Sequence, residues 1–143
     1  MDYELLFSMV GLLAGAGWLL LVLSPLIPTW SDRLAGYLLP AVLAGVYVVI
    51  ALQPNETGGG FGSFAEVAQL FTAESAVMAG WIHFLAFDLA IGAWICRTAR
   101  AARLPFWFIL PTLPLTFLFG PAGFLAFILI LGATKLRPTA KVA

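Results

Sequence analysis

The chain has 143 residues, of which 62% are hydrophobic and 10% charged, and its formal net charge at pH 7 is zero. Soluble domains are about half apolar and about a quarter charged, so this composition excludes a soluble globular protein, and its hydrophobicity excludes intrinsic disorder. With seven basic and seven acidic side chains, the chain also lacks the basic field that attracts nucleic acid. We therefore predict an all-α integral membrane protein whose residues 1–143 form a single transmembrane domain.

The first two membrane helices are predicted at residues 5–23 and 34–52, because each run is mostly apolar and about 20 residues long. Gly11 and Gly15 give the first helix a GxxxG pattern, which allows two helix backbones to approach closely. The second contains Pro40, which membrane helices tolerate where neighbours satisfy the freed backbone groups. The chain starts with acidic residues, unlike a secretory signal, so the first helix is predicted to stay in the membrane.

A surface helix is predicted at residues 64–71, in the polar connection between the second and third membrane helices. Ser63 and Glu66 fit a capping box, in which the two side chains satisfy amides at the helix start. Apolar residues then recur at spacings of three and four, which is typical of a helix with one apolar face. We expect this amphipathic helix to lie on the membrane surface or to fold back over the bundle.

The third and fourth membrane helices are predicted at residues 76–96 and 106–132, which completes a four-transmembrane-helix bundle. The third contains His83 and Asp88, whereas the fourth carries no charged side chain. The fourth is interrupted by the Phe-Gly-Pro-Ala-Gly run at residues 119–123. We expect a kink with partly unwound backbone there, because proline lacks an amide donor.

The basic residues bear on membrane orientation, because cytoplasmic loops carry an excess of Lys and Arg. Arg33 lies in the first loop and three arginines follow the third helix, whereas the start of the chain and the second loop carry only acidic charges. This pattern favours an outside N-terminus. Four full crossings then place the basic tail outside as well, against the rule, whereas a last segment that re-enters at residues 119–123 returns the tail to the cytoplasmic side. Four full crossings are preferred, and the re-entrant path stays open. The charges of the tail are Lys135, Arg137 and Lys141, and the second loop includes Glu56.

Asp88 is the leading candidate for a functional residue, because an ionisable side chain near the middle of a membrane helix is costly and marks a site by default. His83 lies five positions earlier, so the two side chains point about 140° apart on a regular helix. They are expected to line adjoining walls of one pocket rather than to pair directly. A structural role is the alternative for both residues. In that interpretation Asp88 would hydrogen-bond Tyr37, Tyr47 or Thr116 on a neighbouring helix, and His83 would lie at a helix interface with its hydrogen bonds satisfied.

The remaining polar residues give weaker signals. No metal site is predicted, because a single His and a single Cys do not match a standard ligand spacing. Glu74 precedes the third helix, where a carboxylate complements the helix dipole, so capping is the alternative to a functional role there. Cys96 is predicted to be a small packing residue. Arg97, Arg100 and Arg103 are spaced by three and are predicted to anchor the helix end at lipid headgroups.

Three runs of the sequence form a recognisable set. They are Gly-Ser-Phe at residues 62–64, Gly-Trp-Ile-His-Phe-Leu-Ala-Phe-Asp-Leu at residues 80–89 and Phe-Gly-Pro-Ala-Gly-Phe at residues 119–124. Together they resemble the abscisic-acid-deficient-4-like family of small membrane proteins, over nearly the whole chain. The plant members of that family are needed to make neoxanthin from violaxanthin, so the resemblance implies a role in carotenoid or isoprenoid metabolism. Because no transit peptide precedes the first helix, we expect a bacterial member, located in the inner membrane, or a mature chain.

The resemblance implies a reaction without a cofactor, with a carotenoid or lipid as the bound molecule. Isomerisation of a carotenoid epoxide to an allenic alcohol needs an acid at the epoxide oxygen and a base for a polyene proton. A carboxyl group that burial keeps neutral is a good acid and a neutral histidine is a good base. Asp88 and His83 are therefore the predicted catalytic residues, with Glu74 as a third candidate. The predicted substrate-binding residues are Trp81, Phe84, Phe87, Trp94 and Phe119.

A non-enzymatic function is the alternative: a pigment- or lipid-binding subunit, or an assembly factor, of a larger membrane complex. The GxxxG pattern and the small size of the chain favour it. The bilayer and a carotenoid or isoprenoid ligand are the expected partners in either case. A homo-oligomer or a larger membrane complex remains open.

Overall fold

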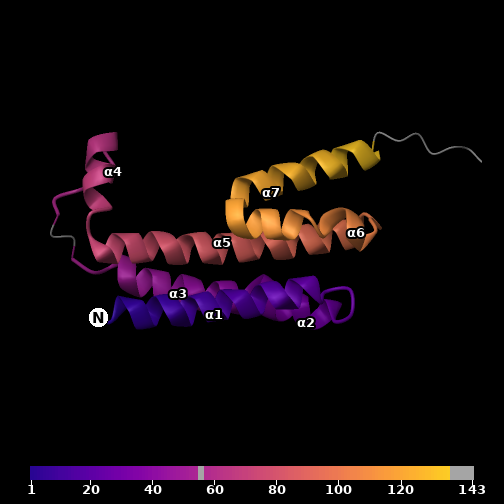
Figure 1. Cartoon of the computed structure of the whole chain (residues 1–143), viewed down its shortest axis with the longest axis horizontal. Helices are drawn as coiled ribbons and strands as arrows, with labels where there is room; N and C mark the ends of the chain where they lie inside the picture. The colour runs from indigo at the N-terminus through magenta and orange to yellow at the C-terminus, as the bar shows by residue number, and fades with distance from the viewer. Residues whose placement is uncertain (55–56, 136–143) are drawn as a thin grey trace, which may run out of the picture.

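The structure, a computed structural model, describes residues 1–54 and 57–135 (Figure 1). Its elements in chain order are α1 (Tyr3–Val22), α2 (Pro28–Arg33), the π-helical turn η1 (Leu34–Leu38), α3 (Leu39–Ala51), α4 (Phe64–Leu70), α5 (Glu74–Ala101), α6 (Phe106–Ile109) and α7 (Thr112–Lys135). The described residues contain no strand, which confirms the predicted all-α class. Three of the charges named above, Glu56, Arg137 and Lys141, lie outside the described residues.

Four helical segments have the residue count and the apolar composition of membrane helices, which confirms the four predicted membrane segments. They are Tyr3–Val22, Pro28–Ala51, Glu74–Ala101 and Phe106–Thr134. The second is continuous through α2, η1 and α3, and the fourth joins α6 to α7. The chain is therefore an integral membrane protein.

Helix α5 is the centre of the bundle, because it packs against α1 and α3 on one side and against α7 on the other (Figure 1). Small residues allow the close approach of α1 and α5. The Leu89 side chain lies over Gly17, and the Trp18 and Leu21 side chains lie over Gly92, so that a methyl group at either glycine would overlap them. Apolar side chains gain little from leaving lipid, so this close packing is what holds membrane helices together.

The GxxxG glycines contribute nothing to this contact within the chain. Gly11 and Gly15 have no atom of another element within 4 Å of the position that a side chain would take. The close approach of α1 therefore uses Gly17, two residues beyond the predicted motif.

The π-helical turn η1 ends just before Pro40, the proline predicted inside the second membrane helix. Proline cannot donate a backbone hydrogen bond, and its ring collides with the carbonyl of the preceding turn. A wider turn of five residues relieves this collision, which is a usual role of π turns within helices. The second membrane segment therefore continues through the proline.

Helix α4 stands across the axis of α5 at the end of the bundle that holds the N-terminus (Figure 1). The Ser63 half of the capping box is confirmed, because the Ser63 hydroxyl accepts from the Glu66 amide at 3.2 Å. The Glu66 carboxylate accepts from the Gly62 amide at 3.0 Å, one residue before the amide that a capping box uses. No residue of α4 is buried, and Phe64 is 90% exposed. An exposed apolar face across the bundle axis fits a helix that lies on the membrane surface.

The fourth segment reverses its direction, as Figure 1 shows for α7. Phe119 has non-helical backbone angles (φ −141°, ψ 47°), and Pro121 follows it. The first arm leads from α6 to this turn, and the second arm runs back, so that Trp94 contacts both Phe124 and Phe127 on it, with ring centroids 5.6 and 5.4 Å apart. We name residues 106–135 the α7 hairpin. Each arm is roughly 20 Å long at the helical rise, which is shorter than a membrane core of about 30 Å.

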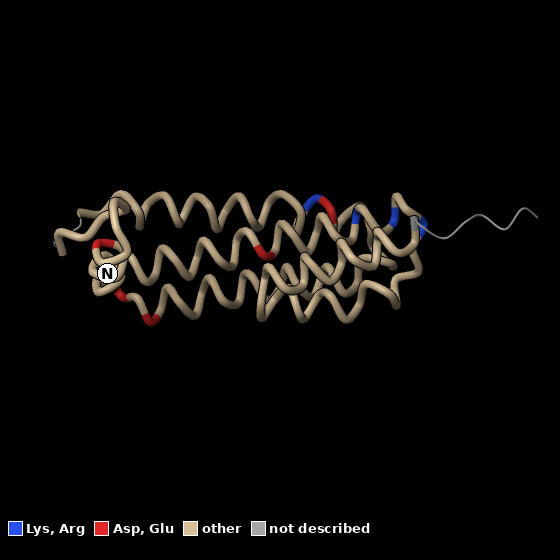
Figure 2. Tube along the Cα trace, turned by 90° about the horizontal axis from the view of Figure 1, so that it is seen from above, with Lys and Arg blue, Asp and Glu red and all other residues tan. Residues whose placement is uncertain are grey.

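The hairpin resolves the conflict between the charges and four full crossings. It follows the re-entrant path that the sequence left open, and α7 ends at the same end of the bundle as Arg97, Arg100 and Arg103 (Figures 1 and 2). Figure 2 shows the Lys and Arg positions toward one end of the molecule, which we name the basic end. Acidic positions lie around the N-terminus at the other end, which we name the acidic end. The described charges therefore agree with the positive-inside rule.

This arrangement predicts which side of the membrane each end faces. In a variant with Cys96→Ala, single cysteines at Asp2→Cys, Arg103→Cys and Thr134→Cys are expected to divide into two groups. A membrane-impermeant maleimide added to intact cells should label Asp2→Cys alone, because only the acidic end faces outward. Detergent should then expose the other two, which controls for side-chain access. Labelling of Thr134→Cys in intact cells together with Asp2→Cys would show that the last segment crosses completely.

Candidate functional site

Asp88 lies halfway along α5, at the depth where the α7 hairpin turns. Its side chain is 6% exposed, and its Oδ2 atom is buried with no hydrogen-bond partner among the described residues. Gly120, at the start of the second arm, lies directly against the Asp88 carboxyl group, and a methyl group there would overlap both carboxyl oxygens. The positive end of the second-arm dipole therefore faces Asp88.

The three residues proposed as hydrogen-bond partners of Asp88 make other contacts instead. Thr116 donates to the Thr112 carbonyl at 2.7 Å within the first arm. The Tyr47 ring contacts His83, and the Tyr37 ring lies under Arg97. Asp88 is therefore not held by a simple side-chain hydrogen bond, and it remains available to a ligand at the hairpin turn.

His83 faces a different side of α5. Its ring is exposed, stacks on Phe87 with centroids 4.6 Å apart, and lies 5.7 Å from the ring of Tyr47 on α3. Asp88 instead faces the α7 hairpin. This agrees with the predicted angle between the two side chains, and it leaves His83 on the α3 side of the helix rather than beside the carboxyl group.

An uncovered strip of α5 leads from the acidic end to Asp88. Glu74, Val77, Trp81, Phe84 and Asp88 follow at spacings of three and four, which places them on one helix face. Val77 is 53% exposed and Trp81 is 36% exposed, because the arms of the hairpin reach only as far as Asp88. We name this set the α5 strip.

Aromatic stacking orders the middle of the α5 strip. The Trp81 ring stacks on Phe84 at 5.5 Å and on Phe7 of α1 at 5.4 Å between centroids. Phe119, which is 63% exposed, lies at the hairpin turn. The strip therefore offers flat apolar surfaces and a carboxyl group at its deep end, which suits an elongated unsaturated ligand.

The structure divides the predicted binding residues into two groups. Trp81 and Phe84 lie on the α5 strip, with Phe119 at its deep end. Phe87 stacks on His83 on the other face, and Trp94 packs against the second arm of the hairpin. Glu74 begins α5 and is exposed at the start of the strip. Within the described residues, no three His, Cys, Asp or Glu side chains gather closely enough to hold a metal ion.

Sequence reasoning missed a polar cluster at the basic end. Arg100 forms an ion pair with Asp32 of α2 at 2.5 Å, and Arg97 lies 5.1 Å from the centroid of the Tyr37 ring. Two of the three arginines predicted to reach lipid headgroups are therefore turned into the protein. The sequence feature that could have indicated this pairing is Asp32, an acidic residue next to Arg33 in the first loop.

A comparison with protein families gives one result that covers most of the chain. The model of a family described as ABA DEFICIENT 4-like matches residues 5–127. No curated protein and no solved structure matches the chain. The matched range contains the whole α5 strip and the turn of the α7 hairpin.

Proposed function

This chain belongs to the ABA DEFICIENT 4-like family, and from that premise we propose that it binds and isomerises a carotenoid or related isoprenoid lipid at the α5 strip. The observation that carries the proposal is the unpartnered carboxyl group of Asp88, buried at mid-helix where an aromatic surface reaches it from the lipid. Membrane proteins keep an ionisable group at this depth at considerable cost, which favours a functional role.

The chemistry of an epoxide-to-allene isomerisation suits a single carboxyl group. The Asp88 carboxylic acid gives its proton to the epoxide oxygen as the carbon–oxygen bond breaks, and a polyene carbon then loses a proton. Because the product is an isomer of the substrate, the carboxylate that remains takes up this proton and the group is restored. General acid and base transfers of this kind contribute about 10²–10⁴-fold to rate.

His83 and Glu74 belong to this proposal only as secondary candidates. His83 lies on the face of α5 that meets Tyr47, and Glu74 begins the helix at the acidic end. The predicted setting, a bacterial inner membrane, and assembly into a homo-oligomer or larger complex belong to the same proposal.

The test is to express the chain in a host that makes epoxycarotenoids and to analyse pigments in the cells and in the purified protein. Conversion of the epoxide to an isomer of identical mass, absent from cells without the chain, is the expected result. A bound carotenoid at fixed stoichiometry without conversion would support the alternative, a pigment-binding subunit, which the exposed aromatic surface of Trp81 and Phe7 favours. Unaltered pigments and a protein free of isoprenoids would overturn both functions.

A further inference from the structure

A small polar cavity lies at the basic end, where α1 ends and α6 begins. Its volume is about 60 Å³, and its polar lining consists of Ser24, Cys96 and Arg100. Ser24 and Cys96 are each 1% exposed. The other lining residues include Pro25, in the turn after α1, and Phe106, the first residue of α6. The cavity therefore lies at the depth of lipid headgroups rather than in the middle of the membrane.

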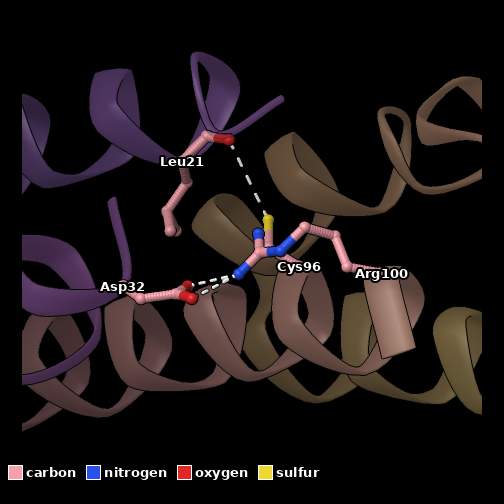
Figure 3. Close-up of polar contacts among 4 residues, drawn as sticks. All are labelled: Leu21, Asp32, Cys96 and Arg100. Carbon is pink, nitrogen blue, oxygen red and sulfur yellow. Dashed lines mark hydrogen bonds and ion pairs between the residues drawn. The ribbon is translucent and has the colours of Figure 1, made fainter. Parts of the chain in front are cut away.

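Arg100, which lines this cavity, has an unused hydrogen-bond donor. Figure 3 shows its guanidinium group between Asp32 and Cys96, with one terminal nitrogen, Nη2, 2.5 Å from both oxygens of Asp32. The other terminal nitrogen, Nη1, is buried and has no partner among the described residues. A buried cationic donor without an acceptor destabilises the protein. A ligand oxygen that accepts a hydrogen bond from this nitrogen would remove that cost.

The charge of the surroundings favours a negative ligand. The described basic positions lie toward one end of the molecule (Figure 2), and they include Arg33, Arg97, Arg100 and Arg103. Asp32 is the acidic partner of Arg100 there. The ion pair with Asp32 neutralises one of these four cations and leaves a net positive field. Arginine donors match phosphate oxygens well, because their bonds are charge-assisted.

A separate apolar groove lies deeper in the membrane, beside the same end of α1. Its volume is about 560 Å³, and it runs between the last turns of α1 and the first arm of the hairpin. The same two parts of the chain supply residues to both spaces: Val22 and Leu110 line the groove, and Ser24 and Ile109 line the cavity. Trp18 and Phe117 line the groove deeper in the membrane. A volume of this order holds an acyl chain.

We propose that the basic end binds one anionic phospholipid, with its phosphate at the cavity of Ser24 and Arg100 and an acyl chain in the groove between α1 and the α7 hairpin. The two spaces lie at the depths of the two parts of a phospholipid. The cavity lies at the helix ends, where headgroups are, and the groove lies beside the helices, where acyl chains are. This site lies apart from the α5 strip, so the proposal goes beyond the proposed function and does not depend on it.

The test measures lipid retention by native mass spectrometry of the protein in a neutral detergent, with phosphatidylglycerol and phosphatidylcholine of identical chains as probes. The wild type is expected to retain one phosphatidylglycerol per chain and to prefer it over phosphatidylcholine. Arg100→Gln should lower this preference about tenfold, the size of one charge-assisted hydrogen bond. Arg103→Gln, at an exposed position of the same end, should leave it unchanged. Arg100→Gln leaves the Asp32 carboxylate without its ion-pair partner. The double variant Asp32→Asn with Arg100→Gln removes both charges, and it should show the same loss of preference.

The groove has its own matched pair of variants. Val22→Trp fills the groove and should reduce retention of both lipids, whereas Val48→Trp, on the lipid-facing side of α3 and 50% exposed, should not. Equal losses in Arg103→Gln and Arg100→Gln would overturn the site in favour of a diffuse basic surface. Stabilisation by inorganic phosphate equal to that by phosphatidylglycerol, measured by thermal unfolding, would overturn the lipid as the source of the phosphate.

Discussion

Replacement of Asp88 with Asn is expected to lower the conversion of the carotenoid substrate by about 100-fold or more, the usual contribution of one general acid. Asn has nearly the same shape as Asp and keeps the carbonyl-like oxygen against Gly120, but it carries no transferable acid proton. The side chain is 6% exposed and has an unpartnered oxygen, so the exchange removes chemistry without removing a hydrogen bond. Pigment composition in a host that makes epoxycarotenoids measures the effect.

The matched control for this variant is Asp2→Asn. Asp2 accepts from the Leu5 amide at 3.0 Å as the cap of α1, and Asn caps helices as well as Asp does, so conversion should stay at the wild-type rate. Ligand retention separates the two functions: Asp88→Asn should still carry the carotenoid that the wild type binds. Full conversion by Asp88→Asn would remove the carboxyl group from the mechanism, and the α5 strip would then stand as a binding surface only.

Gly123→Val is expected to disrupt the α7 hairpin and to reduce the free energy of unfolding by about 3 kcal/mol or more. The second arm passes so close to the first at this position that a methyl group at Gly123 would overlap the backbone nitrogen and the hydroxyl of Thr116. Overpacking of a well-packed core costs about 1–3 kcal/mol, and here the obstructing atoms include backbone, which cannot rotate away. Unfolding in mixed micelles with a graded denaturing detergent gives the value.

Gly132→Val is the control in the same helix. Gly132 has nothing within 4 Å of the position of a side chain, so its substitution should change stability by no more than about 0.5 kcal/mol. The hairpin also positions Gly120 against Asp88, so Gly123→Val should lower the conversion of pigment together with stability. Equal stability of the two variants would mean that the second arm does not rest against Thr116.

The candidate site was partly determined by the sequence. Asp88 was identified because an ionisable group in the middle of a membrane helix is costly. Its position within an apolar segment can be read directly from the sequence. The spacing of Trp81 and Phe84 from Asp88 likewise follows from the helical repeat. The approach of Gly120 to the carboxyl group was not predictable, because it depends on how the hairpin packs against α5. The inward turn of Arg97 and Arg100 was missed for the same reason: their partners, Tyr37 and Asp32, lie on another helix.

The composition of the chain determined its environment and its elements, since four long apolar segments and a capped surface helix follow from local hydrophobicity and local hydrogen bonding. The break at residues 119–123 was also local, because proline and glycine weaken a helix wherever they occur. Whether that break bends the helix or folds it back depends on contacts between distant residues. In the tertiary structure the segment folds back. Gly123 allows the two arms to touch at Thr116, and Trp94 packs against Phe124 and Phe127 of the second arm.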